Sequence, residues 1–189
     1  MLEFQSEINN SLSILNNGKI LLYPTDTVWG LGCDASDENA VTKVFKMKQR
    51  AESKSLIILV DSIEMLEKYI ELIPEKVKKI LTKPERPTTI IYDNPRHLAK
   101  NVIAQDNTVA IRIVQDEFCK NLIHQFGKPI VSTSANRSGM PTPNSFKEIE
   151  QSILDTADYI VNLHREKINQ QSSQIIKIDQ SGEIVFIRK

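Results

Sequence analysis

Residues 48–60 read Lys-Gln-Arg-Ala-Glu-Ser-Lys-Ser-Leu-Ile-Ile-Leu-Val, a group of cations followed at once by five apolar residues. A helical pattern precedes the cations, because Asp37 is a typical N-cap residue and apolar positions recur from Ala40 to Met47. A short continuous apolar run such as 56–60 is typical of a strand that is buried on both faces. The stretch therefore predicts a helix, a loop and a buried strand in succession, as in an α/β sheet.

The rest of the chain continues this alternation. We expect helices over 4–16, 62–71, 74–82, 116–126 and near 145–154, and strands over 20–23, 88–92, 109–113, 129–131, 159–161, 173–178 and 184–187. The last two strands are joined by residues 179–182, which read as a hairpin turn. Strands that alternate with helices first and pair locally at the end indicate one mixed sheet with helices packed on it. No repeat or linker is visible, so we expect a single domain over residues 1–189.

The composition excludes several classes of protein. Twenty-four basic and 24 acidic residues give a formal net charge of zero, which argues against a polycation for nucleic acid but leaves a local basic patch open. Two cysteines, Cys33 and Cys119, argue against a disulfide framework or a zinc site and indicate half-buried thiols in a reducing compartment. No apolar run approaches the ~20 residues of a membrane span, and no signal peptide is visible. We therefore expect a cytoplasmic protein without a membrane segment.

Three polar segments adjoin predicted strands. The segment 24–32 (Pro-Thr-Asp-Thr-Val-Trp-Gly-Leu-Gly) offers hydroxyls, a carboxylate and glycines, which suit a small polar ligand or a turn that satisfies its own backbone. The cations of 46–54 lie at a helix end, where they either face solvent or bind phosphate at the sheet edge. The segment 132–139 (Ser-Thr-Ser-Ala-Asn-Arg-Ser-Gly) supplies short hydrogen-bond donors directly after a strand. Together these segments indicate a site for a phosphorylated ligand.

One further cation lies inside an apolar strand. Arg112 ends the run Thr108-Val109-Ala110-Ile111-Arg112, and a buried guanidinium is costly unless it is paired. Its partner is either an internal carboxylate or the carboxylate of a ligand. The three histidines show no metal-ligand spacing, and neither a P-loop nor a dinucleotide fingerprint is present, so the sequence predicts no metal site.

The four segments occur in an order that resembles the YrdC-like family, and most of all its short, single-domain threonylcarbamoyl-AMP synthases, over roughly residues 8 to 187. The resemblance implies an open, twisted α/β sheet with a concave, positively charged surface. It also implies a reaction that joins L-threonine, bicarbonate and ATP, with Mg²⁺, to give threonylcarbamoyl-adenylate and pyrophosphate. The adenylate would then serve the modification of tRNA beside the anticodon.

Roles for single residues follow from the same resemblance. The threonine contacts would be Thr27, Arg112 and Ser132, and the ATP contacts would be Lys48, Arg50, Lys54, Thr108, Ser134 and Asn136. Lys48 and Arg50 would also act catalytically by neutralising charge on the triphosphate. Two alternatives stay open, a double-stranded RNA-binding module and a carbamoyl-transfer domain. Contacts with RNA or tRNA, and docking to a downstream threonylcarbamoyl transferase, also stay open.

Overall fold

A computed structural model describes residues 2–50, 55–168, 171–179 and 181–189. Its helices are α1 (Leu2–Asn16), α2 (Glu38–Lys48), α3 (Ile63–Tyr69), α4 (Glu75–Thr82), α5 (Glu117–Phe126) and α6 (Gln151–Leu154), with 3-10 turns η1 (Lys100–Val102) and η2 (Phe146–Glu148). Its strands are β1 (Leu21–Tyr23), β2 (Gly30–Gly32), β3 (Ile57–Val60), β4 (Thr88–Asp93), β5 (Thr108–Ile113), β6 (Ile130–Ser134), β7 (Tyr159–Ile160), β8 (Gln174–Ile178) and β9 (Ile184–Arg188).

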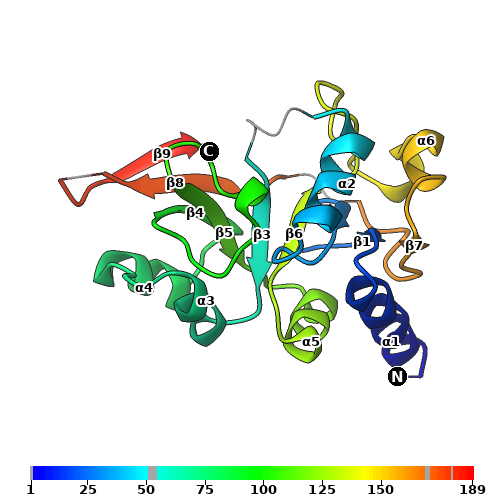
Figure 1. Cartoon of the computed structure of the whole chain (residues 1–189), viewed down its shortest axis with the longest axis horizontal. Helices are drawn as coiled ribbons and strands as arrows, with labels where there is room; N and C mark the ends of the chain where they lie inside the picture. Colours follow the sequence, from blue (N-terminus) through cyan, green and yellow to red (C-terminus); the bar gives the residue numbers. More distant parts are fainter. Residues whose placement is uncertain (1, 51–54, 169–170, 180) are drawn as a thin grey trace.

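The strands form one nine-stranded sheet in the order β7-β1-β2-β6-β3-β5-β4-β8-β9. The pairs β1–β7, β3–β5 and β4–β8 are parallel, and the other neighbours are antiparallel. The sheet runs along the molecule with the hairpin β8–β9 at one end and β7 at the other, while α1, α3, α4 and α5 lie along one side (Figure 1). The predicted mixed α/β sheet with flanking helices is therefore confirmed, and the single domain over 1–189 stays a prediction.

Two parts of the sheet differ from the sequence-based expectation. Residues 30–32 form strand β2, although the sequence predicts no strand within the segment 24–32. The strand is not visible in the sequence because glycine carries no apolar side chain. The packing nevertheless requires glycine, because a Cβ on Gly32 would lie 2.5 Å from the Val131 carbonyl oxygen and 2.6 Å from the Tyr23 ring. Strand β6 also continues to Ser134, so the hydroxyls of 132–134 lie within the strand rather than after it.

The core differs from expectation at the cysteines. Cys33 and Cys119 are free thiols with no exposed surface, so both are fully buried rather than half-buried. Burial raises the pKa of each thiol, which makes both unreactive.

Across the described part of the chain, no helix combines the length and the apolar character needed to cross a bilayer.

Candidate active site

The strand register gathers polar side chains from distant parts of the chain onto one face of the sheet. Residues directly opposite on neighbouring strands project to the same face, and every second residue along a strand does so too. The pairings that fix this arrangement are Leu59 with Arg112, Ile57 with Ser132, and Gly30 with Ser134. Arg112, Ser132 and Ser134 therefore share one face.

A cleft of about 190 Å³ opens on this face. Its described lining consists of hydroxyl side chains, three arginines and a few small or apolar residues: Thr27, Val28, Gly30, Arg50, Ser55, Ile57, Arg112, Ser132, Thr133, Ser134, Thr142, Ser172, Ser173, Ile175 and Arg188. Five of the predicted site residues are among them, namely Thr27, Arg50, Arg112, Ser132 and Ser134. No carboxylate occurs in this described lining, so the cleft favours anionic ligands.

Arg112 is held in place by the segment that follows β1. Its Nη2 lies 3.1 Å from Asp26 Oδ1, and only 3% of the Arg112 side chain and 8% of the Asp26 side chain are exposed. Its Nη1 donates to Thr27 Oγ1 at 3.0 Å, and Asp26 Oδ2 accepts from the Gln115 backbone N–H at 3.1 Å. The sequence did not decide whether Arg112 pairs with an internal carboxylate or with a ligand, and the structure pairs it with Asp26. Arg112 also borders the cleft.

The hydroxyl of Thr27 has a fixed hydrogen-bonding role. Thr25 Oγ1 donates its one proton to the Val28 carbonyl at 2.7 Å, so in the 3.0 Å contact between Thr25 and Thr27 the donor is Thr27. Thr27 Oγ1 already accepts from Arg112, which leaves it one lone pair and no proton. Toward a ligand in the cleft, Thr27 can therefore only accept a hydrogen bond.

Arg50 reaches the cleft because helix α2 ends in a defined turn. Asp37 caps the start of the helix by accepting from two backbone N–H groups, and Gln49 ends it with a left-handed φ of 50°. The Gln49 N–H bonds to the Lys46 carbonyl and the Arg50 N–H to the Phe45 carbonyl, which is the Schellman pattern. Arg50 Nη2 donates to the Ser55 carbonyl at 2.8 Å, and burial lowers the Arg50 pKa.

Lys48 lies behind the cleft rather than in its described lining. Only 1% of the residue is exposed, and its Nζ donates to the backbone carbonyls of Ser134 and Asn136. The Lys48 carbonyl in turn accepts from the Ser138 N–H at 2.8 Å. Burial, followed by the neighbouring charge of Arg50, lowers the pKa of Lys48 to about 8.

Three other predicted ATP contacts do not appear in this lining. Asn136 Nδ2 donates to the carbonyls of Arg137 and Met140 and closes the turn after β6. Thr108 Oγ1 donates to Asp106 Oδ1 at 2.7 Å. Lys54 lies outside the described residues. The roles of these residues stay predictions.

Among the residues of the described lining that were not predicted from the sequence are Arg188 in β9 and Ser173 directly before β8. Arg188 donates from Nε and Nη2 to the Ser173 carbonyl at 3.0 and 2.7 Å, and Ser173 Oγ lies 2.8 Å from Thr89 Oγ1. Burial and the nearby charge of Arg112 lower the Arg188 pKa. Arg188 is the last residue of β9, whereas Arg112 lies inside β5.

The described residues form no group of three or more His, Cys, Asp or Glu side chains that could hold a metal ion. The cleft itself offers guanidinium groups for anions and hydroxyls for orientation.

Comparisons with known proteins show the family to which the chain belongs. The Sua5/YciO/YrdC family model, described as "Telomere recombination", matches residues 13–189. A threonylcarbamoyl-AMP synthase from Pseudoalteromonas translucida is 35% identical over 161 residues, which cover 84% of this chain and 86% of the relative.

Solved structures show the same fold. Sua5 of P. abyssi complexed with L-threonine superposes with a TM-score of 0.84 at 28% identity, over 96% of this chain, so the chain spans about half (53%) of that protein. YciO of E. coli superposes with a TM-score of 0.83 over 98% of this chain and 89% of its own, and at 22% identity it supports the fold alone. The family model and the Pseudoalteromonas relative each cover most of this chain, so the chain belongs to the Sua5/YciO/YrdC family.

Proposed function

We propose that this protein is a threonylcarbamoyl-AMP synthase, which joins L-threonine, bicarbonate and ATP, releases pyrophosphate and supplies the adenylate for threonylcarbamoyladenosine formation in tRNA. The curated relative that covers most of the chain carries this name. The observation that carries the proposal is one cleft lined by Arg50, Arg112, Ser132 and Ser134, which we assign to two anion-binding sets, Arg112 with Ser132 and Arg50 with Ser134. Two such sets suit an amino acid carboxylate and a triphosphate at the same time.

The first set fits the amino acid. Arg112 is oriented by Asp26 and Thr27, and a guanidinium fixed in this way binds a carboxylate through two parallel hydrogen bonds. Thr27 can only accept toward the cleft, so it suits the N–H groups of an amine rather than a second carboxylate. Ser132, which is 7% exposed, lies on the same sheet face as Arg112 and completes this half.

The second set fits ATP. Arg50 supplies positive charge and Ser134 a hydroxyl at the cleft, and Lys54, Thr108 and Asn136 are proposed as further nucleotide contacts. Mg²⁺ enters with the nucleotide as part of the substrate. Arg188 adds a third guanidinium, so the described lining is well suited to a ligand with several negative charges.

The proposed reaction has two steps. The threonine amine attacks bicarbonate or carbon dioxide, and a carbamate forms with loss of water or a proton. A carbamate oxygen then attacks the α-phosphorus, the bond to the β-phosphate bridging oxygen breaks, and pyrophosphate leaves with the electron pair. The side chains position the two substrates and neutralise the charge on the transferring phosphoryl group, without a covalent intermediate on the enzyme. The product would pass to a downstream threonylcarbamoyl transferase in the cytoplasm.

The test is threonine-dependent release of pyrophosphate from ATP in the presence of labelled bicarbonate. Arg112→Lys should raise the KM for threonine by about tenfold or more, because an ammonium cannot make the paired contact. Arg50→Ala should raise the KM for ATP, and the exposed Lys46→Ala serves as the matched control.

Absence of pyrophosphate release from folded protein would refute the proposal. Salt-dependent binding of double-stranded RNA without ATP consumption would instead favour an RNA-binding module.

A further inference from the structure

The ammonium group of Lys48 is hydrogen-bonded to backbone carbonyls. A buried ammonium is costly unless hydrogen bonds satisfy it, and it has three N–H donors to offer. In Lys48, contacts to the Ser134 and Asn136 carbonyls use two of these donors while the residue is only 1% exposed. The position of the ammonium is therefore explained by the protein itself.

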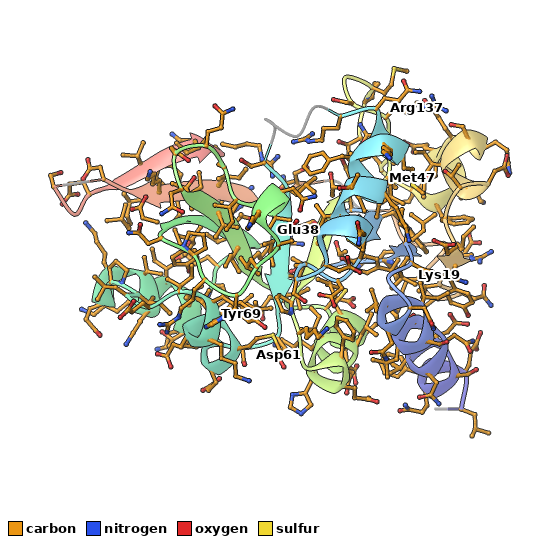
Figure 2. The ribbon with its side chains drawn as sticks, in the orientation of Figure 1. Lys19, Glu38, Met47, Asp61, Tyr69 and Arg137 are labelled. Carbon is orange, nitrogen blue, oxygen red and sulfur yellow. The ribbon has the colours of Figure 1, made fainter. Side chains whose placement is uncertain are left out.

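The same residue is bonded a third time through its backbone. The Ser138 N–H donates to the Lys48 carbonyl at 2.8 Å, so three hydrogen bonds join Lys48 to the segment 134–138. This segment passes the C-terminal end of α2, where Met47 and Arg137 are labelled on the two neighbouring elements (Figure 2). The end of α2 and the end of β6 are thus joined as one unit.

Both joined segments carry a cleft residue. Arg50 follows Lys48 by two positions, through the left-handed turn at Gln49, and Ser134 contributes the carbonyl that Lys48 binds. Arg50 and the side chain of Ser134 line the cleft. Any movement of Lys48 relative to β6 would therefore change the separation of two proposed phosphate contacts.

We propose that Lys48 is a positioning residue, which ties the end of α2 to the end of β6 and thereby holds Arg50 and Ser134 at a fixed separation across the cleft. The identity of the ligand, ATP, rests on the proposed function, whereas the tie between the two segments does not. The family resemblance implies a direct ATP contact for the same lysine. For that role the ammonium would have to reach the ligand through its one remaining N–H from a position that is only 1% exposed, or give up a carbonyl, and each charge-assisted bond lost disfavours such a state by about tenfold or more.

The test compares Lys48→Met with Lys46→Met, an exposed lysine on the same helix. Amide hydrogen exchange is measured first in the ligand-free proteins. In Lys48→Met the N–H groups of Asn136 and Ser138 should exchange about tenfold faster or more, because the bonds that hold the segment are lost, while those of α5 keep their rates. Lys46→Met should match the wild type throughout.

Steady-state kinetics give the second readout. Lys48→Met should raise the KM for ATP about tenfold or more and leave the KM for threonine within about twofold, because Asp26 and Thr27 hold Arg112 independently. Lys48→Gln keeps a neutral donor and should give intermediate exchange rates, so it tests the proposal if Lys48→Met fails to fold.

Unchanged exchange at 136–138 together with weakened ATP binding would overturn the proposal, since it would show a direct ligand contact. Uniformly faster exchange across the protein would also overturn it. Because exchange requires neither substrate, a failure of the proposed enzymatic activity would leave this result intact.

Discussion

The buried ion pair between Arg112 and Asp26 gives a sharp test of how the cleft is stabilised. Asp26→Asn preserves the size of the side chain and a hydrogen-bond acceptor for the Gln115 N–H, but it removes the charge opposite a guanidinium that is 3% exposed. Arg112 then keeps Thr27 as an uncharged partner. Breaking a buried pair by removing one charge costs about 3 to 5 kcal/mol, and we expect about 3 because the cleft gives Arg112 some access to water.

For a chain of this length, about 3 kcal/mol lowers the melting temperature by about 6 to 12 °C. Thermal unfolding followed by circular dichroism measures this shift directly. The matched control is Asp93→Asn, which makes the same change in the Lys177–Asp93 pair, whose side chains are 33% and 63% exposed. An exposed pair contributes at most about 1 kcal/mol, so the control should melt within about 4 °C of the wild type.

The double variant Asp26→Asn/Arg112→Met removes both buried charges and should recover much of the lost stability. Equal melting temperatures for Asp26→Asn and Asp93→Asn would refute the reasoning, because they would show that the buried pair contributes no more than an exposed one.

Three further predictions concern stability. Gln49→Gly should raise the melting temperature by about 2 to 4 °C in thermal unfolding, because glycine adopts the left-handed φ of 50° without the steric penalty of about 1 kcal/mol; an unchanged value would contradict this. Gly32→Ala should lower the unfolding free energy by about 1 to 3 kcal/mol in urea, because its Cβ would lie 2.5 Å from a backbone oxygen; a neutral effect would show that β1 and β6 can separate. The pKa of Lys48 is about 8 in the folded protein, below its ordinary unfolded value, so the unfolded chain binds more protons above pH 8. The unfolding free energy of the wild type should therefore rise relative to that of Lys48→Met from about pH 8 to about pH 10, and parallel pH profiles would rule this out.

Local patterns predicted most of the elements because they depend on neighbouring residues. The N-cap at Asp37 and the apolar run 56–60 are examples. Strand β2 was missed because glycine carries no apolar side chain, and the packing that requires Gly32 comes from Tyr23 and Val131 across the sheet. Such cross-strand contacts are not visible in a local pattern.

Roles in the site were predictable where the burial of charge restricts the options. Arg112 within an apolar strand had to be paired, and its partner proved to be Asp26. The direction of the Lys48 ammonium could not be predicted, since a cation at a helix end can point to solvent, ligand or backbone. Arg188 was not predicted because it reaches the cleft only when the hairpin β8–β9 joins the sheet. The hairpin joins through the parallel pairing of β8 with β4, in which Thr89 lies opposite Ile175.

The position of Arg188 on β9 also bears on how the cleft forms during synthesis. Thr27 and Arg188 border the same cleft but lie about 160 residues apart in the chain. At about 5 to 20 residues per second, the ribosome adds Arg188 roughly 8 to 30 s after Thr27. Throughout that interval the nascent chain lacks at least one of the three guanidinium groups of the described lining, so we expect high affinity for polyanionic ligands only after the last hairpin has docked.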